Sequence, residues 1–408
     1  MKYKQLALAS LALSSPGWVL ADSVDERLSR MEAEMAAMQR KIEAQETTIR
    51  QQADTLAEQE TLRTEGAPQR VEKLEEDLGE KLTAEDKEGA WYEKIKVGGV
   101  VEVEAYYTSP YVGDSESDVV LSTFELGVES QVTDWVNVGA SLLYEEDDTD
   151  LEVDVAYATL ANADVTPVFV TAGQIYVPFG AYETALISDP LTLEIGETRE
   201  TALQLGFDRN GLIGSVYVFN GDNEKDGKNR ISSWGVNLNY THALENGDVA
   251  AGIGYLSDLG DSDSLQDVIN DNQGDNDTDF TGGWTLNVVG HFGSFSLIGE
   301  YLAAAEDFSA TAVPWKQGGA KPSAWNLEAD YAFRMFDKDA TVAFAYQGTD
   351  EALALELPKQ RFLIGLSTEI FKNTSLSFEW AHDEDYDASD GGTGKSADSV
   401  VAQLAVEF

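Results

Sequence analysis

The chain has 408 residues, with 27 Lys and Arg against 74 Asp and Glu, and a formal net charge of −47. Such a charge repels phosphate backbones and argues against nucleic acid as a partner. No apolar run of about 18 or more residues follows the N-terminus, which excludes a bundle of membrane-spanning helices. Cysteine is absent, so disulfides and thiolate metal sites are excluded as well.

The first 21 residues have the pattern of an export signal. Lys2 and Lys4 precede a short apolar run at 6–13, and Pro16-Gly17 and a stretch ending in Ala21 follow. We therefore expect residues 1–21 to be removed on export. A buried N-terminal helix is the alternative.

Residues 22–90 are predicted to form a periplasmic helical region that begins with a coiled coil. Seam positions recur at alternating spacings of three and four residues, which is the heptad pattern: Leu28, Met31, Met35, Met38, Ile42, Gln45, Ile49, Gln52, Leu56 and Gln59. One helix cannot bury so narrow a stripe alone. The pattern favours a homo-oligomer over a helix packed on the protein's own body.

Residues 91–408 are predicted to form an all-β, 16-stranded antiparallel transmembrane barrel. The period changes to two, and the number of candidate strands is even, as expected of a closed bacterial barrel. They lie at 95–107, 118–132, 135–145, 151–162, 167–176, 200–208, 211–220, 230–241, 248–258, 280–291, 293–304, 322–334, 339–349, 357–371, 373–384 and 397–408.

The connections between these strands alternate between short turns and longer acidic loops, which indicates periplasmic turns and external loops. Within strands, apolar residues alternate with polar ones, as in Trp325, Leu327 and Ala329 against Asn326 and Glu328. The last strand ends in Phe408, the type of signal that the outer-membrane barrel assembly machinery recognises. We expect an outer-membrane protein of a Gram-negative bacterium, with both termini in the periplasm and with lipid and lipopolysaccharide around it.

The polar strand faces supply the candidate lumen lining. The acidic residues assigned to it are Glu102, Glu104, Glu125, Glu129, Glu152, Asp154, Glu300, Glu328, Asp330, Glu369, Glu379 and Glu407, and the basic ones are Arg334 and Arg361. A low-dielectric wall with one sign of charge concentrates counter-ions, so this balance predicts a preference for cations. Alternatively, these carboxylates are simply hydrated.

The segment 177–199 is too apolar for a loop in water, and it follows the fifth predicted strand. We expect it to bend into the lumen as a constriction. Its candidate solute contacts are Phe179, Tyr182, Glu183, Asp189, Glu194, Glu197 and Arg199. A contact between subunits would also explain the apolar content.

The chain has few residues of the types that catalysis commonly uses, with three histidines and no cysteine. His242 and His291 fall in predicted turns and His382 at a strand end, with no spacing that suggests a catalytic triad. We predict no enzyme activity, no cofactor and no metal site.

Three stretches, 143–160, 171–207 and 214–222, resemble the LbtU-type siderophore porins, a family of legiobactin-receptor-like outer-membrane proteins. The block 174–199 is the most specific part. The resemblance implies uptake of a ferric siderophore without the plug of TonB-type receptors. A cation-preferring general porin is the second hypothesis. A structural protein that ties the outer membrane to the periplasm is the third.

Overall fold

The computed structural model describes residues 94–146, 149–223, 228–273 and 279–408. The export signal (1–21) and the helical region (22–90) lie outside the described residues and stay predictions. Every element described below belongs to the unit Trp91–Phe408.

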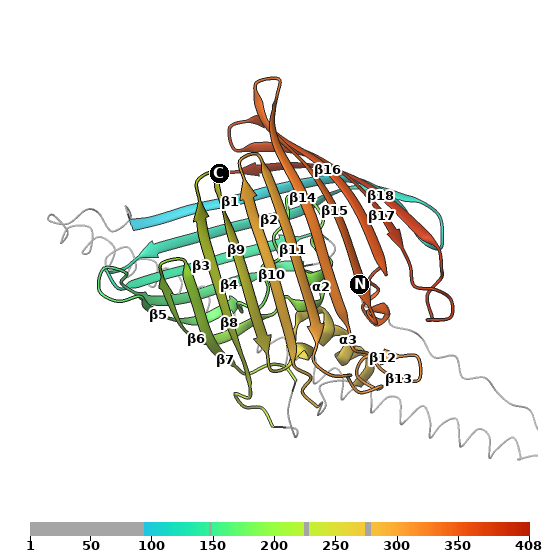
Figure 1. The fold of residues 1–408 in the computed structure, drawn as a ribbon, viewed down its shortest axis with the longest axis horizontal. Helices are drawn as coiled ribbons and strands as arrows, with labels where there is room; N and C mark the ends of the chain where they lie inside the picture. Colours follow the sequence, from blue (N-terminus) through green and yellow to red (C-terminus); the bar gives the residue numbers. More distant parts are fainter. Residues whose placement is uncertain (1–93, 147–148, 224–227, 274–278) are drawn as a thin grey trace, which may run out of the picture. The chain divides into compact units, whose positions relative to one another are not determined.

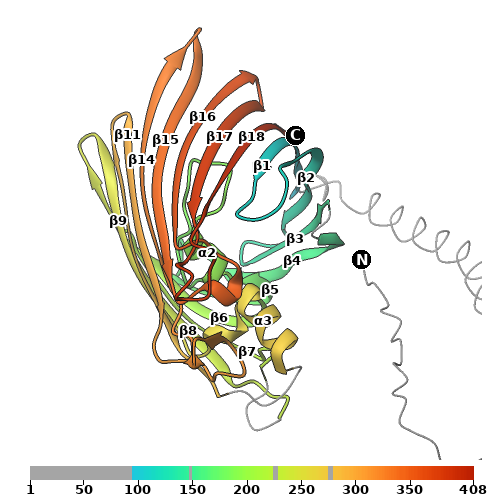
Figure 2. The same ribbon diagram turned by 90° about the vertical axis from the view of Figure 1, so that its right-hand side faces the viewer.

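Sixteen strands form one closed antiparallel barrel in which β1 pairs with β18 (Figures 1 and 2). The predicted strand number and closure are confirmed, and the predicted boundaries are correct to within a few residues. The strands are β1 Ile95–Ser109, β2 Glu116–Gln131, β3 Val136–Glu145, β4 Thr149–Ala161, β5 Val168–Tyr176, β6 Arg199–Arg209, β7 Leu212–Phe219, β8 Ser233–Leu244, β9 Gly247–Leu256, β10 Gly283–Phe292, β11 Phe295–Ala304, β14 Ser323–Met335, β15 Lys338–Asp350, β16 Gln360–Phe371, β17 Thr374–Glu384 and β18 Ser396–Glu407.

The two ends of the barrel differ in their connections. At the end where β1 begins and β18 stops, the connections are short turns such as Asn210-Gly211, where a positive φ suits both residues. The connections at the opposite, long-loop end contain the smaller elements that the structure describes (Figure 1). These are α2 Leu191–Gly196, η3 Leu259–Asp261, α3 Asp263–Gln273, β12 Pro314–Trp315, β13 Gly318–Gly319 and η4 Leu353–Leu355. The predicted alternation of connections is confirmed.

The pleat sorts side chains as the sequence pattern predicts. On β14, Leu327 faces outward and is 57% exposed, whereas Asn326 and Glu328 face inward and are buried. An outward apolar face suits lipid, and an inward polar face suits a water-filled interior.

An apolar core occupies part of the barrel interior near the long-loop end. Inward side chains of β5, β7, β9 and β11 meet side chains of α2, α3 and the segment 308–320 there. None of the helices that the structure describes is long and apolar enough to cross a membrane.

The three histidines lie on three different strands. His242 is on β8, His291 on β10 and His382 on β17, so the predicted turn positions of the first two are wrong. β8 extends to Leu244, beyond its predicted end at 241, and β10 continues one residue past His291, the last residue of the predicted strand 280–291.

Candidate channel constriction

The connection between β5 and β6, residues 177–198, crosses the barrel interior, and we call it the crossing loop. Its backbone amides donate to three inward carboxylates: Ala181 N to Glu300 on β11 (2.7 Å), Ala185 N to Glu328 on β14 (2.7 Å) and Ile187 N to Glu379 on β17 (2.6 Å). Four strands separate β6 from β11, and five separate β5 from β17 in the other direction. The predicted inward path is therefore confirmed.

Side-chain hydroxyls strengthen the same attachments. Thr184 donates to Glu328 (2.8 Å), Thr192 donates to Glu300 (2.9 Å), and Ser188 donates to Glu379. A hydrogen bond to a charged group contributes about 1.5–3 kcal/mol net. The loop is thus held at several points by bonds of the stronger kind.

Apolar contacts fix the loop between these attachments. Phe179, Leu191 and Ile195 are buried in the interior core. The apex of the loop comprises residues 186–188. There, Leu186 packs on a patch of Ala345, Leu363 and Ala381. Burial on both sides of the apex explains why so apolar a sequence can form a loop inside a polar barrel.

Two predicted solute contacts need correction. Phe179 is only 2% exposed, and Tyr182 packs against the same core with its hydroxyl buried and unbonded within the described residues. Burial raises the pKa of Tyr182 well above its usual value. Both rings turn to the apolar core because it offers them more burial than the polar lumen. Neither presents its ring to a passing solute.

The acidic loop residues have different surroundings. Asp189 is exposed and lies near Glu379 and Glu104, and desolvation inside the barrel, followed by the charges of those two residues, raises its pKa. Glu102 on β1 also lies within reach of its charge. Asp189 and the β1 wall thus form one acidic region.

The other three acidic loop residues lie in separate surroundings: Glu183, Glu194 and Glu197. Glu183 is exposed and lies near Glu300. Glu194 is on α2, near Arg361. Glu197 has its pKa raised to about 7 by desolvation, followed by the charges of Asp263 and Asp189. Its backbone oxygen accepts a bond from Asp263 N (3.0 Å), which ties α3 to the loop.

Two lumen arginines are neutralised by carboxylates. Arg199 contacts Glu152 (2.5 Å) and Asp154 (3.2 Å) on β4. Arg361 on β16 binds Asp383 (2.8 Å).

Arg334 lies apart from both pairs, in the short-turn region at the end of β14. It is 71% exposed and donates to the carbonyl of Asp337 (2.7 Å). It therefore does not meet the crossing loop, although its strand face is the predicted one.

The remaining predicted lining residues lie on inward faces. Glu104 accepts a bond from Gln403 on β18 (2.9 Å), and Glu125 lines a hollow along β1 and β2. Asp330 is buried beside Glu328. Within the described ranges, no group of three or more acidic or histidine side chains could hold a metal ion.

Sequence reasoning missed two residues here. Gln347 on β15 accepts a bond from Leu191 N (3.2 Å), and Asp383 pairs with Arg361. Asp383 lies within the predicted strand 373–384 and shares the parity of Glu379, so the same face assignment would have found it. Gln347 carries no charge, and its partner is 156 residues away, so no local signal marks it.

No family model matches the chain. It is 29% identical over 361 residues to a UPF0422 protein of Legionella pneumophila, a match that covers 77% of this chain and 66% of that relative, just under two thirds. A UPF0422 protein of Coxiella burnetii is 29% identical over 330 residues, covering 76% of this chain and 69% of the relative.

Solved outer-membrane channels share the fold. DcaP of Acinetobacter baumannii has a TM-score of 0.53 at 15% identity, covering 77% of this chain and 97% of that one. OmpF of Salmonella typhi has 0.55 at 14% identity, with the same coverage, and OprB of Pseudomonas putida has 0.53 at 10%, covering 77% and 94%. The chain therefore has the fold of outer-membrane porins.

Proposed function

We propose that the protein is an outer-membrane porin through which small hydrophilic solutes diffuse, narrowed by the crossing loop and preferring cations. The observation that carries this proposal is the crossing loop itself, held inside a closed barrel by Glu300, Glu328 and Glu379. A loop fixed in this way limits the size of solutes without closing the acidic side of the lumen.

The preference for cations follows from the charges that stay unneutralised. Arg199 and Arg361 are paired with carboxylates, whereas Asp189 lies near the carboxylates of Glu102 and Glu104. Fields of one sign in a low-dielectric channel raise the local concentration of the opposite charge. Small cations should therefore pass more readily than anions of the same size.

The test is electrical. Purified full-length protein in a planar bilayer should give discrete conductance steps, and its reversal potential in a KCl gradient should have the sign of cation flow. A protein that inserts as a folded barrel but conducts nothing would contradict the porin function. An anion-selective channel would contradict only the charge argument.

A ferric siderophore is the second candidate cargo, because the stretch that most resembles the siderophore porins, 174–199, contains the loop that crosses the lumen. Uptake of radioactive iron into liposomes, measured for ferric chelates of different net charge, tests this cargo. Normal growth of a deletion strain on every iron source would argue against it.

We also propose that both termini face the periplasm. Phe408 exchanges backbone hydrogen bonds with Gly99 (3.0 Å each) at the short-turn end, which leaves its exposed side chain for the barrel assembly machinery to recognise. Protease protection of an N-terminal epitope in intact cells would test this orientation.

A further inference from the structure

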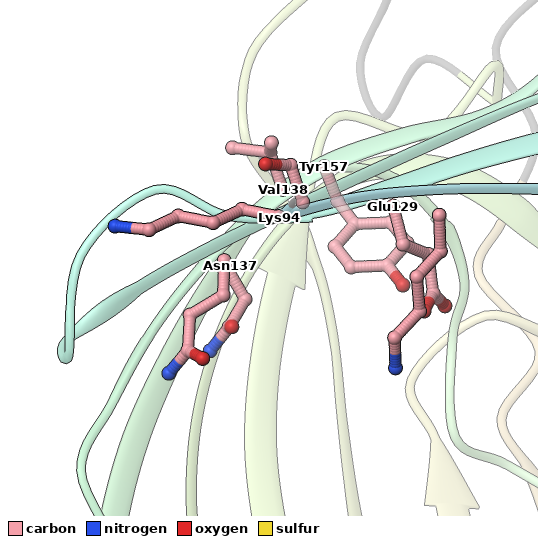
Figure 3. A pocket seen from close by; sticks show the side chains of 8 residues that line it. Lys94, Glu129, Asn137, Val138 and Tyr157 are labelled. Carbon is pink, nitrogen blue, oxygen red and sulfur yellow. The ribbon is translucent and has the colours of Figure 1, made fainter. Parts of the chain in front are cut away.

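A hollow of about 480 Å³ lies on the inner wall at the short-turn end of β1–β4. It is lined by Lys94, Lys96, Glu129, Ser130, Gln131, Asn137, Val138 and Tyr157. Figure 3 shows Tyr157 between Asn137 and Glu129, while Lys94 extends away from the ring. None of these residues belongs to the crossing loop.

Strand register aligns the main groups of this hollow. Lys96 on β1 is the cross-strand partner of Glu129 on β2, Glu129 is the partner of Gly139 on β3, and Gly139 is the partner of Tyr157 on β4. The ring of Tyr157 covers Gly139, since a Cβ there would lie 2.7 Å from the ring. An ammonium group, a carboxylate and an aromatic ring are therefore presented side by side.

The polar groups of this hollow differ from those elsewhere on the inner wall. Among the described residues, Lys96, Glu129 and Asn137 make no ion pair or side-chain hydrogen bond with one another or with the rest of the protein. Polar side chains elsewhere on the inner wall do bond to one another, as in the pairs Glu104–Gln403, Ser141–Asp154 and Gln204–Ser215. Unpaired donors and acceptors that converge on one concave space are typical of ligand sites.

We propose that this hollow binds small zwitterions that carry one ammonium and one carboxylate group, such as a free amino acid. The ligand carboxylate faces Lys96, its ammonium faces Glu129 and the adjacent ring of Tyr157, and the amide of Asn137 supplies a further hydrogen bond. A ligand with a single charge satisfies one of the two charged groups and leaves the other unpaired. This proposal rests on the proposed porin function in one respect only, because the ligand reaches the hollow through the channel.

Binding is measured apart from transport, on the full-length protein in detergent micelles, by saturation-transfer NMR. The probes are L-alanine, L-alaninamide and propionate, which differ mainly in charge. L-Alanine should bind best, and Lys96→Met and Glu129→Gln should each weaken it about tenfold. The exchanged pair Lys96→Glu with Glu129→Lys should restore binding, because a zwitterion can turn around. Lys372→Met, in another turn at the same end, is the control.

Equal affinity for the three probes would overturn the proposal, as would wild-type L-alanine binding in both single variants. Glucose is tested as a fourth compound, and tighter binding of glucose than of L-alanine would overturn the proposal in favour of a sugar site. Retained heat-modifiable migration shows that each variant is folded. A protein that binds L-alanine but does not conduct would refute the porin function and leave this site standing; a channel that conducts without binding would do the reverse.

Discussion

Replacing Glu379 by Gln should detach the apex of the crossing loop from the barrel wall. The side chain of Glu379 is 3% exposed and accepts bonds from Ile187 N (2.6 Å), Ser188 N (3.2 Å) and the Ser188 hydroxyl. An amide keeps one acceptor oxygen and turns an N–H₂ group toward a donor. The substitution removes one hydrogen bond to a charged group and weakens another. The free energy that holds the apex on the wall should therefore fall by about 3 kcal/mol.

That cost multiplies the population of the detached apex by roughly a hundredfold, since 1.4 kcal/mol is a factor of ten. The assay is single-channel recording, in which Glu379→Gln should add current noise or a larger conductance level. Ser188→Ala removes one hydroxyl and should cost only about 1 kcal/mol. In the Glu379→Gln background it should cost less still, because the two groups share one interaction.

Glu369→Gln is the matched control, because Glu369 is exposed on the neighbouring strand β16. Noise and conductance in Glu379→Gln that match the wild type would refute the reasoning, provided that amide exchange at Ile187 and Ser188 is also unchanged. The apex would then be held by its apolar contacts, with Leu186 against Ala345, Leu363 and Ala381 as the main anchor.

Three further changes test other parts of the molecule. Deleting residues 182–193 should widen the conductance and weaken discrimination among ferric chelates, and wild-type values for both would contradict the constriction. Deleting 24–63, outside the described residues, should lower the subunit number measured by light scattering and leave the barrel folded. Burial raises the pKa of both Asp258 and Asp261, so the structure around these residues and α3 should lose stability as pH rises from 5 to 8. Amide exchange of α3, corrected for its intrinsic pH dependence, measures this stability. Asp258→Asn should make it depend less on pH.

The barrel could be predicted from the sequence because its signals are local. Alternation along β14 and the terminal Phe408 each depend on a few neighbouring residues, and turns such as Asn210-Gly211 need no distant partner. The crossing loop was predictable for a related reason, since its apolar composition conflicts with a position in water. Composition alone therefore indicated that the segment is buried, although not what buries it.

The partners of the loop could not be predicted, because they lie more than 100 residues away along the chain. Glu300, Glu328 and Glu379 have the pattern of ordinary lumen carboxylates, and only the closed barrel shows that loop amides reach them. The prediction that Phe179 and Tyr182 contact the solute was wrong for the same reason. The core that buries them is completed by α3 and by the segment 308–320, whose packing leaves no local trace in the sequence.

The fate of these carboxylates changes how selectivity is explained. Three of the twelve predicted lumen acids hold the crossing loop, and Glu152 and Asp154 neutralise Arg199. The field acting on a solute therefore comes mainly from Asp189 and the wall of β1 and β2, on one side of the lumen. A ferric chelate that follows this wall gains from neutral or positive charge and is repelled when anionic. Under the proposed uptake of ferric chelates, charge should then discriminate among the iron complexes that are small enough to pass the crossing loop.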